Sequence, residues 1–309
     1  MRLVSVRGRY APSPTGRLHL GNVRTALLAW LQIRALSGTF VMRIEDVDRG
    51  RSRPHFEDTL LEDLRWLGLD WDEGPDCGGD YGPYRQSECE ERYAAALARL
   101  DTFPCTCTRK EVRAAAASGS GEEPIYPGTC WNGPTHPERP SSTRWHPPEG
   151  AVEVTDARLG TLREDLRAEA GSFLLRRRDG DWAYNLAVVV DDGFMRISHV
   201  LRGEDLWTST PRHVALARAL GLPVPQYAHA PLLRGPDGEK LSKRHGAPDV
   251  AALREAGEDP RRVVAWLARS VGLVPERVRT VTAQALVADF DVSAIEDRPL
   301  AGMVDPWRL

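Results

Sequence analysis

Apolar side chains recur with two different spacings in the first hundred residues. Residues 3–10 form a short apolar run, whereas apolar side chains return every three or four positions over residues 23–34. The first pattern predicts a strand and the second a helix with one buried face. A short buried strand is predicted over residues 39–44, and further helices over residues 55–69 and 90–100. The chain therefore begins as an α/β fold.

The remaining pattern predicts more strands and then a helical end. Residues 182–190 are almost continuously apolar, which favours a central parallel strand buried on both faces. Another strand is predicted over residues 197–201, and a helix that Pro211 helps to open runs to residue 219. Weaker strand patterns cover residues 151–154 and 172–178, and helical patterns cover residues 250–256, 261–270 and 282–290.

A change in composition near residue 99 marks a domain boundary. The following segment contains an Ala/Gly/Ser-rich excursion and proline-rich sequence up to residue 148. Such a short excursion cannot bury enough apolar surface to be stable alone. We expect a catalytic domain formed by residues 1–98 and 184–246, interrupted by an inserted lobe over residues 99–183. A helical subdomain over residues 247–309 is expected to follow.

The loop between the first strand and the first helix has features of a phosphate site. Pro12 and Pro14 stiffen it, and Gly16 and Gly21 allow the backbone to approach a ligand closely. The helix that follows presents free N–H groups and a partial positive charge, which favour a bound phosphate. His19 and the neighbouring Asn22 can add side-chain donors. The alternative is an ordinary strand–turn–helix with a capping asparagine.

Charge and cysteine content restrict the function. The 309 residues are 41% hydrophobic and 28% charged with a net charge of −3, which excludes a uniformly basic nucleic-acid binder but allows a local basic face. No run of about 18 apolar residues and no signal-peptide core occur, so we expect a cytoplasmic protein and no membrane partner. Five cysteines in a chain of this length do not form a disulfide framework.

Three of the cysteines, with one tyrosine, have a metal-like spacing: Cys105, Cys107, Tyr126 and Cys130. Zinc favours cysteine and histidine, and a tyrosine ligand is unusual. Because all four positions would be protein ligands, the metal would be structural. The alternative is two buried cysteines and an unrelated third. Cys77 and Cys89 have no such pattern and stay unassigned.

Two separated motifs resemble the signatures of class I aminoacyl-tRNA synthetases. Residues 19–22 read His-Leu-Gly-Asn and resemble "HIGH", and residues 240–244 read Lys-Leu-Ser-Lys-Arg and resemble "KMSKS". Residues 9–16 and 23–27 resemble the glutamyl members specifically. The resemblance implies a Rossmann-like parallel sheet and an inserted zinc-binding lobe. It also implies an ATP site, with Mg²⁺ bridging the phosphates, at His19, Gly21, Asn22, Lys240, Ser242, Lys243 and Arg244.

Free glutamate carries two carboxylates and one ammonium group, so its site should offer two cations and one acid. Arg9, Arg202 and Glu45 supply that set at the ends of predicted strands, and Tyr184 can add a hydroxyl group. Structural roles in a salt bridge and in the core are the alternatives for Arg202 and Tyr184, and a solvated acidic turn is the alternative for Glu45. The resemblance implies a glutamate site at Arg9, Ala11, Ser13, Glu45, Tyr184 and Arg202.

The chain reaches only a short helical segment after the second motif, whereas glutamyl-tRNA synthetases continue into an anticodon-binding region. The resemblance is therefore to the truncated paralogues of these enzymes. These make glutamyl-adenylate and transfer glutamate to queuosine, the wobble base of tRNA(Asp). The partners implied are L-glutamate, ATP and the anticodon loop of that tRNA, and we expect a monomer.

Two other hypotheses stay open. One is a catalytic fragment of glutamyl-tRNA synthetase that charges the 3′ end of tRNA. The other is a catalytically idle paralogue that binds RNA or an amino acid. The presence of His19, Lys243, Arg9 and Glu45 argues against the idle paralogue.

Overall fold

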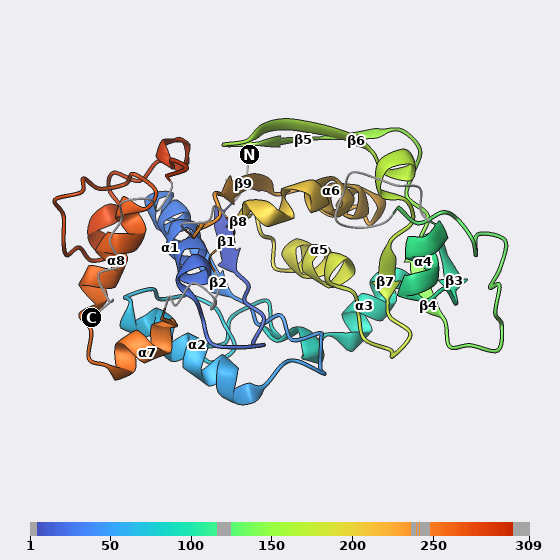
Figure 1. Ribbon diagram of the computed structural model, residues 1–309, viewed down its shortest axis with the longest axis horizontal. Coiled ribbons are helices and arrows are strands. Elements are labelled where there is room, and N and C mark those ends of the chain that lie inside the picture. The colour runs from blue at the N-terminus through green and yellow to red at the C-terminus, as the bar shows by residue number, and fades with distance from the viewer. Residues whose placement is uncertain (1–4, 116–124, 236–238, 240, 242–247, 299–309) are drawn as a thin grey trace.

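The central feature of the fold is a six-stranded sheet (Figure 1). The computed structural model describes residues 5–115, 125–235, 239, 241 and 248–298. The strand order is β2-β1-β8-β9-β5-β6, in which the first five strands pair in parallel and β6 is antiparallel to β5. The strands are β1 (Arg7–Tyr10), β2 (Thr39–Met42), β5 (Ala151–Asp156), β6 (Gly160–Asp165), β8 (His199–Gly203) and β9 (Gln226–Ala230). The parallel sheet predicted from the sequence is confirmed.

Helices cover both faces of this sheet. Side chains alternate between the two faces along a strand, and in β8 Leu201 joins a core formed with α1, whereas Val200 joins a core formed with α5 and α6. A Cβ atom on Gly8 would lie 2.3 Å from Ile33 Cγ1, so β1 and α1 pack at a distance that only glycine allows. The larger helices around the sheet are α1 (Leu20–Ala35), α2 (Pro54–Trp66), α3 (Glu90–Leu97), α5 (Tyr184–Phe194) and α6 (Thr210–Ala219).

The prediction of a strand over residues 182–190 was wrong, because most of this segment is helical: helix α5 begins at Tyr184. The helix is apolar on nearly every side, and residues 186–192 are all buried between the sheet and its helical neighbours. A helix buried all round loses the periodicity that identifies a helix at a protein surface. Its run of valines then has the same pattern as a central strand.

A second, three-stranded antiparallel sheet forms a separate small layer, seen at the right of Figure 1. Its strands are β3 (Thr102–Cys105), β4 (Ser142–Trp145) and β7 (Leu174–Arg176), with helix α4 (Arg109–Ala115) beside them. A π-helical turn, η2 (Leu166–Ala170), precedes β7. The lobe predicted over residues 99–183 also contributes β5 and β6 to the large sheet, so that part of it is continuous with that sheet.

Two helices of the last segment pack on the first part of the chain. They are α7 (Val250–Glu255) and α8 (Pro260–Arg269), and Arg254 on α7 contacts Asp63 on α2 through Nε and Oδ1 at 2.9 Å. The helix predicted over residues 282–290 was wrong in extent, because only a short 3₁₀ turn, η5 (Gln284–Leu286), forms there. The other short turns are η1 (Gln86–Glu88), η3 (Glu204–Ser209) and η6 (Val292–Ala294).

Arg24 ties helix α1 to two distant segments. Its guanidinium is buried and donates Nη2–H to the carbonyl oxygen of Pro231 and Nη1–H to Ser270 Oγ, the latter at 3.2 Å. Burial lowers the pKa of Arg24 to about 10, which still leaves it charged at neutral pH. Within the described ranges, no helix is both long and apolar enough to cross a membrane.

Candidate functional site

A cavity of about 560 Å³ opens where the parallel strands end. It lies beyond the carboxyl ends of β1 and β8, the usual position of ligands in sheets of this type. Leu241 also lines it, but Lys240, Ser242, Lys243 and Arg244 lie outside the described residues. The cavity brings together these residues predicted for the ATP and glutamate sites: Arg9, Ala11, Ser13, His19, Gly21, Asn22, Glu45, Tyr184 and Arg202.

His19 is held at the start of α1 by a reciprocal pair of hydrogen bonds. Its Nδ1 atom accepts from the backbone N–H of Asn22 at 3.2 Å, and its backbone N–H donates to Asn22 Oδ1 at 3.4 Å. Because Nδ1 accepts, the proton of the neutral ring resides on Nε2. A Cβ atom on Gly21 would lie 3.1 Å from His19 Cε1, so glycine leaves room for the imidazole.

Arg43, which sequence reasoning missed, lies beneath the cavity with no exposed surface. It donates to Asp192 Oδ1 at 2.7 Å and to Glu45 Oε1 at 3.0 Å, and Arg9 Nε contacts Asp192 at 3.2 Å. Burial alone would raise the pKa of Asp192, but Arg9 and Arg43 outweigh it and lower that pKa. Burial raises the pKa of Glu45 despite the same arginines, so a bound ammonium group would stabilise its charged form.

Arg202 occupies a second buried network, made mainly of neutral groups. Its Nε–H donates to His229 Nε2 at 3.0 Å and its Nη1–H to His213 Nδ1 at 2.9 Å. A guanidinium can only donate, so each of these ring nitrogens must be unprotonated. Burial lowers the pKa of both histidines, most strongly for His213. Among the described residues, Arg202 contacts no carboxylate.

The two histidines are themselves fixed by hydrogen bonds on their far sides. His229 Nδ1–H donates to Asp156 Oδ2 at 2.7 Å, and His213 Nε2–H donates to Asn185 Oδ1 at 2.9 Å. The rings therefore carry their protons on opposite nitrogens, and each presents a lone pair to Arg202. These supporting residues come from β5, α5, α6 and β9, and no local sequence motif predicts their role.

Tyr184 lines the cavity from the first position of α5. Burial raises the pKa of its hydroxyl group, so the group is protonated at neutral pH and can donate to a ligand. Its ring packs edge-on against the ring of His213, with 5.7 Å between ring centroids. This contact connects Tyr184 with the network that holds Arg202.

The cavity walls have more positive than negative groups. Of the charged side chains that line the cavity, those of Arg9, Arg17 and Arg202 are cationic, and those of Glu45 and Asp205 are anionic. The nearby histidines are neutral and add no charge. The arrangement is complementary to a small ligand with a net negative charge that also carries a cationic group.

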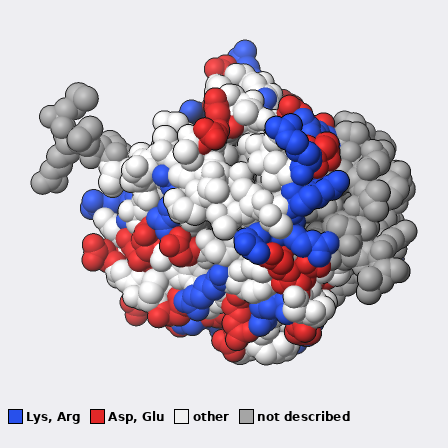
Figure 2. Space-filling model, turned by 90° about the vertical axis from the view of Figure 1, so that its left-hand side faces the viewer, with Lys and Arg blue, Asp and Glu red and all other residues white. Residues whose placement is uncertain are grey.

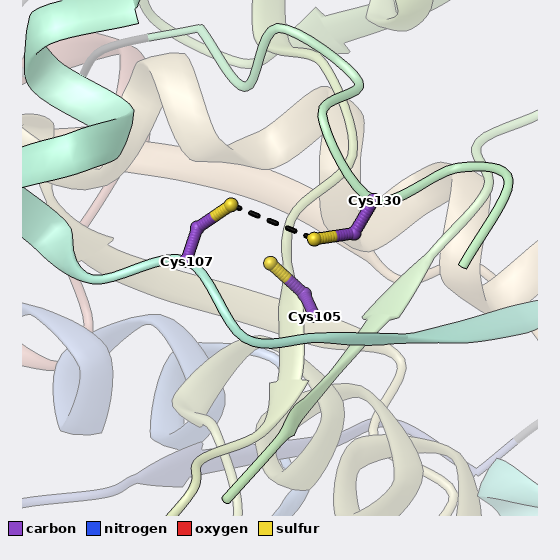
Figure 3. A group of neighbouring side chains, drawn as sticks. All are labelled: Cys105, Cys107 and Cys130. Atoms are coloured by element: carbon purple, nitrogen blue, oxygen red, sulfur yellow. Dashed lines mark hydrogen bonds between the residues drawn. The ribbon is translucent and has the colours of Figure 1, made fainter. Parts of the chain in front are cut away.

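The sulfur atoms of Cys105, Cys107 and Cys130 point toward one another in the small lobe (Figure 3). They lie within 4.8 Å of each other, and Cys107 Sγ is 3.6 Å from Cys130 Sγ. A tetrahedral zinc site with Zn–S bonds of about 2.3 Å would place its sulfurs roughly 3.8 Å apart. The cluster therefore fits zinc.

Hydrogen bonds prepare this cluster for a cation. Burial alone would raise the pKa of Cys130, but backbone hydrogen bonds from Thr135 and Thr106 outweigh it and lower the pKa to about 5. The hydroxyl group of Tyr126 lies 3.4 Å from Cys105 Sγ and accepts from the backbone N–H of Cys130 at 2.8 Å. Burial raises the pKa of Tyr126, which favours a neutral phenol in the absence of a metal.

Comparison with known proteins identifies close relatives. The family described as tRNA synthetases class I (E and Q), catalytic domain, matches residues 5–301. A protein of Deinococcus radiodurans named glutamyl-Q tRNA(Asp) synthetase is 54% identical over 89% of this chain and 94% of its own. One of the same name from Symbiobacterium thermophilum is 50% identical over 95% of this chain and 94% of its own.

A solved structure agrees with the fold. A glutamate tRNA ligase from Elizabethkingia meningosepticum, in complex with its amino acid, superposes with a TM-score of 0.81 at 29% identity. The match covers 96% of this chain and 66% of that ligase.

Proposed function

The chain belongs to the class I tRNA synthetases of the glutamate and glutamine type, and from this premise we propose that it activates glutamate with ATP and transfers it to queuosine in tRNA(Asp). The observation that carries the proposal is the charge of the cavity, whose lining holds three arginines and two carboxylates. Glutamate, with two carboxylates and one ammonium group, complements such a site. Two relatives at 54% and 50% identity are named for this activity.

Glutamate would bind through charges of both signs. The Arg202 guanidinium, which has no carboxylate partner among the described residues, would pair with one carboxylate of the amino acid. Arg9 would face the other carboxylate, and Glu45 would accept hydrogen bonds from the ammonium group. Tyr184 would donate its hydroxyl proton, and the segment with Ala11 and Ser13 would complete the wall.

ATP would bind where helix α1 begins. The free amides at the helix N-terminus and His19 would hold its phosphates, with Gly21 and Asn22 shaping that end of the site. Lys240, Ser242, Lys243 and Arg244, outside the described residues, would neutralise the pyrophosphate. A Mg²⁺ ion bound to the phosphates would spread their charge. No covalent help from the protein is needed, because positioning and charge stabilisation are sufficient.

The reaction would consist of two substitutions. In the first, an oxygen of the glutamate α-carboxylate bonds to the α-phosphorus of ATP, and the bond to the departing pyrophosphate breaks. In the second, a hydroxyl group of the modified base attacks the glutamyl carbonyl carbon, and an ester forms. AMP leaves, and the hydroxyl proton passes to solvent. Because ATP and tRNA are both required, we assign this activity to the cytoplasm.

A zinc ion would support the lobe rather than take part in the reaction. Cys105, Cys107 and Cys130, with Tyr126 as the fourth predicted position, would surround it completely. A closed site of this kind has no position for a substrate. Its expected contribution is to hold the small sheet together.

The site of glutamate attachment tests the proposal. Labelled glutamate and ATP would be supplied with an isolated anticodon stem-loop that carries queuosine, and the matched control is the same stem-loop with guanosine. We expect label only on the queuosine loop, because the acceptor hydroxyl group belongs to the modification. Label at the 3′-terminal adenosine of a full tRNA, with none on the loop, would instead identify a glutamyl-tRNA synthetase.

A further inference from the structure

Two arginine-bearing segments adjoin, in the sequence, residues that line the cavity. One is the rim loop, residues 46–53, which follows Glu45 directly. The other is the rim hairpin, residues 176–182, which leads into Tyr184. Since an extended residue spans at most about 3.6 Å, Arg49 lies within roughly 15 Å of Glu45, Arg178 within roughly 22 Å of Tyr184, and Arg53 within roughly 29 Å of Glu45. Any large substrate that delivers a group to the cavity passes close to them.

The two segments contact each other through a shared carboxylate. Asp48 Oδ2 is 2.7 Å from Arg51 Nε in the rim loop and 3.6 Å from Arg177 Nη1 in the rim hairpin. The Arg51 side chain is 75% exposed and that of Arg177 is 43% exposed. The contact therefore orders the two segments side by side while both guanidinium groups stay accessible.

A second carboxylate repeats this arrangement. Glu90 lies 3.2 Å from Arg176 of the rim hairpin and 3.9 Å from Arg49 of the rim loop, which is 64% exposed. Glu90 also accepts from Trp182 Nε1 at 2.7 Å, and the Arg176 guanidinium stacks over that indole ring. One anion thus faces two cations here as well, so positive charge remains in excess.

Two further arginines of the rim have no carboxylate partner among the described residues. The exposed side chain of Arg53 donates only to the carbonyl oxygen of Ser52. Its backbone N–H donates to the carbonyl oxygen of Pro14, in the loop between β1 and α1, at 3.0 Å. Arg178 is exposed and donates to the carbonyl oxygen of Cys107 at 2.7 Å. That bond fixes the tip of the rim hairpin on the cysteine cluster.

We propose that the rim loop and rim hairpin together bind the phosphate backbone of the RNA that brings its acceptor base to the cavity. The proposal rests on the transfer of glutamate to RNA inferred above and assigns the RNA contact to named residues. Four of the six arginines of the rim contact three carboxylates, Asp48, Glu90 and Asp179. Asp46 and Asp181 also lie in the two segments, so six arginines accompany five carboxylates, and Arg53 and Arg178 are the two that contact none among the described residues. Arginine suits phosphate because its fork can donate two parallel hydrogen bonds.

The charge of the rest of the protein explains why RNA binding needs a local, positively charged surface. The net charge is −3, and the face shown in Figure 2 carries Lys and Arg side chains close to Asp and Glu side chains. RNA attraction through such a mixed surface is weak, so a concentrated group of arginines beside the cavity would dominate it. The backbone contacts would position the loop, and the cavity would select the base.

The dependence of RNA affinity on salt tests the rim. The dissociation constant of the queuosine-containing anticodon stem-loop would be measured over a series of salt concentrations for the parent, Arg53→Ala and Arg178→Ala. Each lost phosphate contact should reduce the logarithmic salt slope by about 0.7 to 0.9. Arg218→Ala is the matched control, since Arg218 is exposed on α6 and contacts no carboxylate among the described residues. Its slope should equal that of the parent.

Two further measurements separate the possible results. Arg178→Lys should restore the slope, because the slope depends on the number of cationic contacts to phosphate and lysine keeps the positive charge. Glutamate-dependent pyrophosphate exchange without RNA should stay unchanged in all variants. Slopes that equal the parent value in both alanine variants, with exchange intact, would overturn the rim assignment alone. A parent that lacks exchange would overturn the proposed function instead.

Discussion

The cavity and the cysteine cluster are assembled in opposite ways. The cavity depends on contacts between residues far apart in the sequence, such as Arg9 with Asp192 and Arg202 with His229. The cysteine cluster comes from a segment of 26 residues, and among the residues that the structure describes, its apolar core contains six side chains. The cavity is therefore supported by the two large cores that flank the sheet, whereas the cluster has little apolar burial of its own.

This difference teaches where each site obtains its stability. Buried arginines and carboxylates remain in place because the whole fold holds them, so the cavity is organised before a ligand arrives. Three buried thiols with one pKa near 5 repel each other as they ionise, and a cation would relieve that repulsion. Loss of metal should therefore affect the lobe, and loss of ligand should leave the cavity intact.

The largest effect is expected from removing a cysteine of the cluster. Cys130→Ala should reduce bound zinc from about one atom per chain to nearly none, because structural zinc binding in small sites is worth roughly 10 kcal/mol or more. Elemental analysis and thermal unfolding would measure the loss. Cys89→Ala is the control, since Cys89 is buried outside the cluster. Equal zinc content in both variants would contradict the metal site.

Removing a cavity cation should have the next largest effect. Arg202→Ala would leave a buried ligand carboxylate unpaired, at a cost of roughly 2–5 kcal/mol in glutamate binding. The KM for glutamate in pyrophosphate exchange would rise correspondingly, while the zinc content would not change. Arg262→Ala, an exposed change on α8, is the control. An unaltered KM in Arg202→Ala would exclude Arg202 from the glutamate site.

The neutral histidines predict a dependence of stability on pH. Burial lowers the pKa of His213 well below its ordinary value of 6.5. Below pH 6.5 this histidine therefore binds a proton in the unfolded chain but stays neutral in the folded protein. The free energy of unfolding should therefore fall with decreasing pH, by about 1.4 kcal/mol per pH unit for this histidine. Urea denaturation of the parent and His213→Gln at pH 7, 6 and 5 would measure it. Parallel curves for the two proteins would contradict the buried neutral state.

The smallest effect concerns Asp156, which acts on Arg202 through His229. Asp156→Ala removes the acceptor of the His229 Nδ1–H bond and should raise the KM for glutamate about fivefold, the value of one hydrogen bond of about 1 kcal/mol. Asp156→Asn keeps an oxygen acceptor and should recover most of the loss. Steady-state kinetics would test both, with kcat expected to stay constant. Similar KM values for Ala and Asn would show that the hydrogen bond does not position Arg202.

Sequence patterns predicted the parts of the cavity that lie on local motifs. His19 and Glu45 were found because they follow recognisable turns and strand ends, and the structure brings both to the cavity. Arg43, His213 and His229 were missed, although Arg43 stands only two residues before Glu45. Their importance depends on partners up to 149 residues away in the sequence, and no periodicity records such contacts.

The same reasoning explains the errors in the fold. Helix α5 was read as a strand because burial on all sides removes the polar face that identifies a helix. The segment over residues 282–290 has helical composition, but it forms only a short turn. That turn is enough to bury Leu286 and its neighbours against the larger core. In both cases tertiary contacts override local preference.

The buried guanidinium of Arg24 couples ligand binding in the cavity to the stability of a distant helix. It connects helix α1, which His19 caps, with Pro231 at the cavity and with Ser270 at the end of α8. Opening of α8 must break one of these bonds, so a ligand that stabilises the closed arrangement also lowers the frequency of that opening. Amide hydrogens of α8 should therefore exchange with deuterated water more slowly when glutamate and ATP are bound, although this helix lines no part of the cavity.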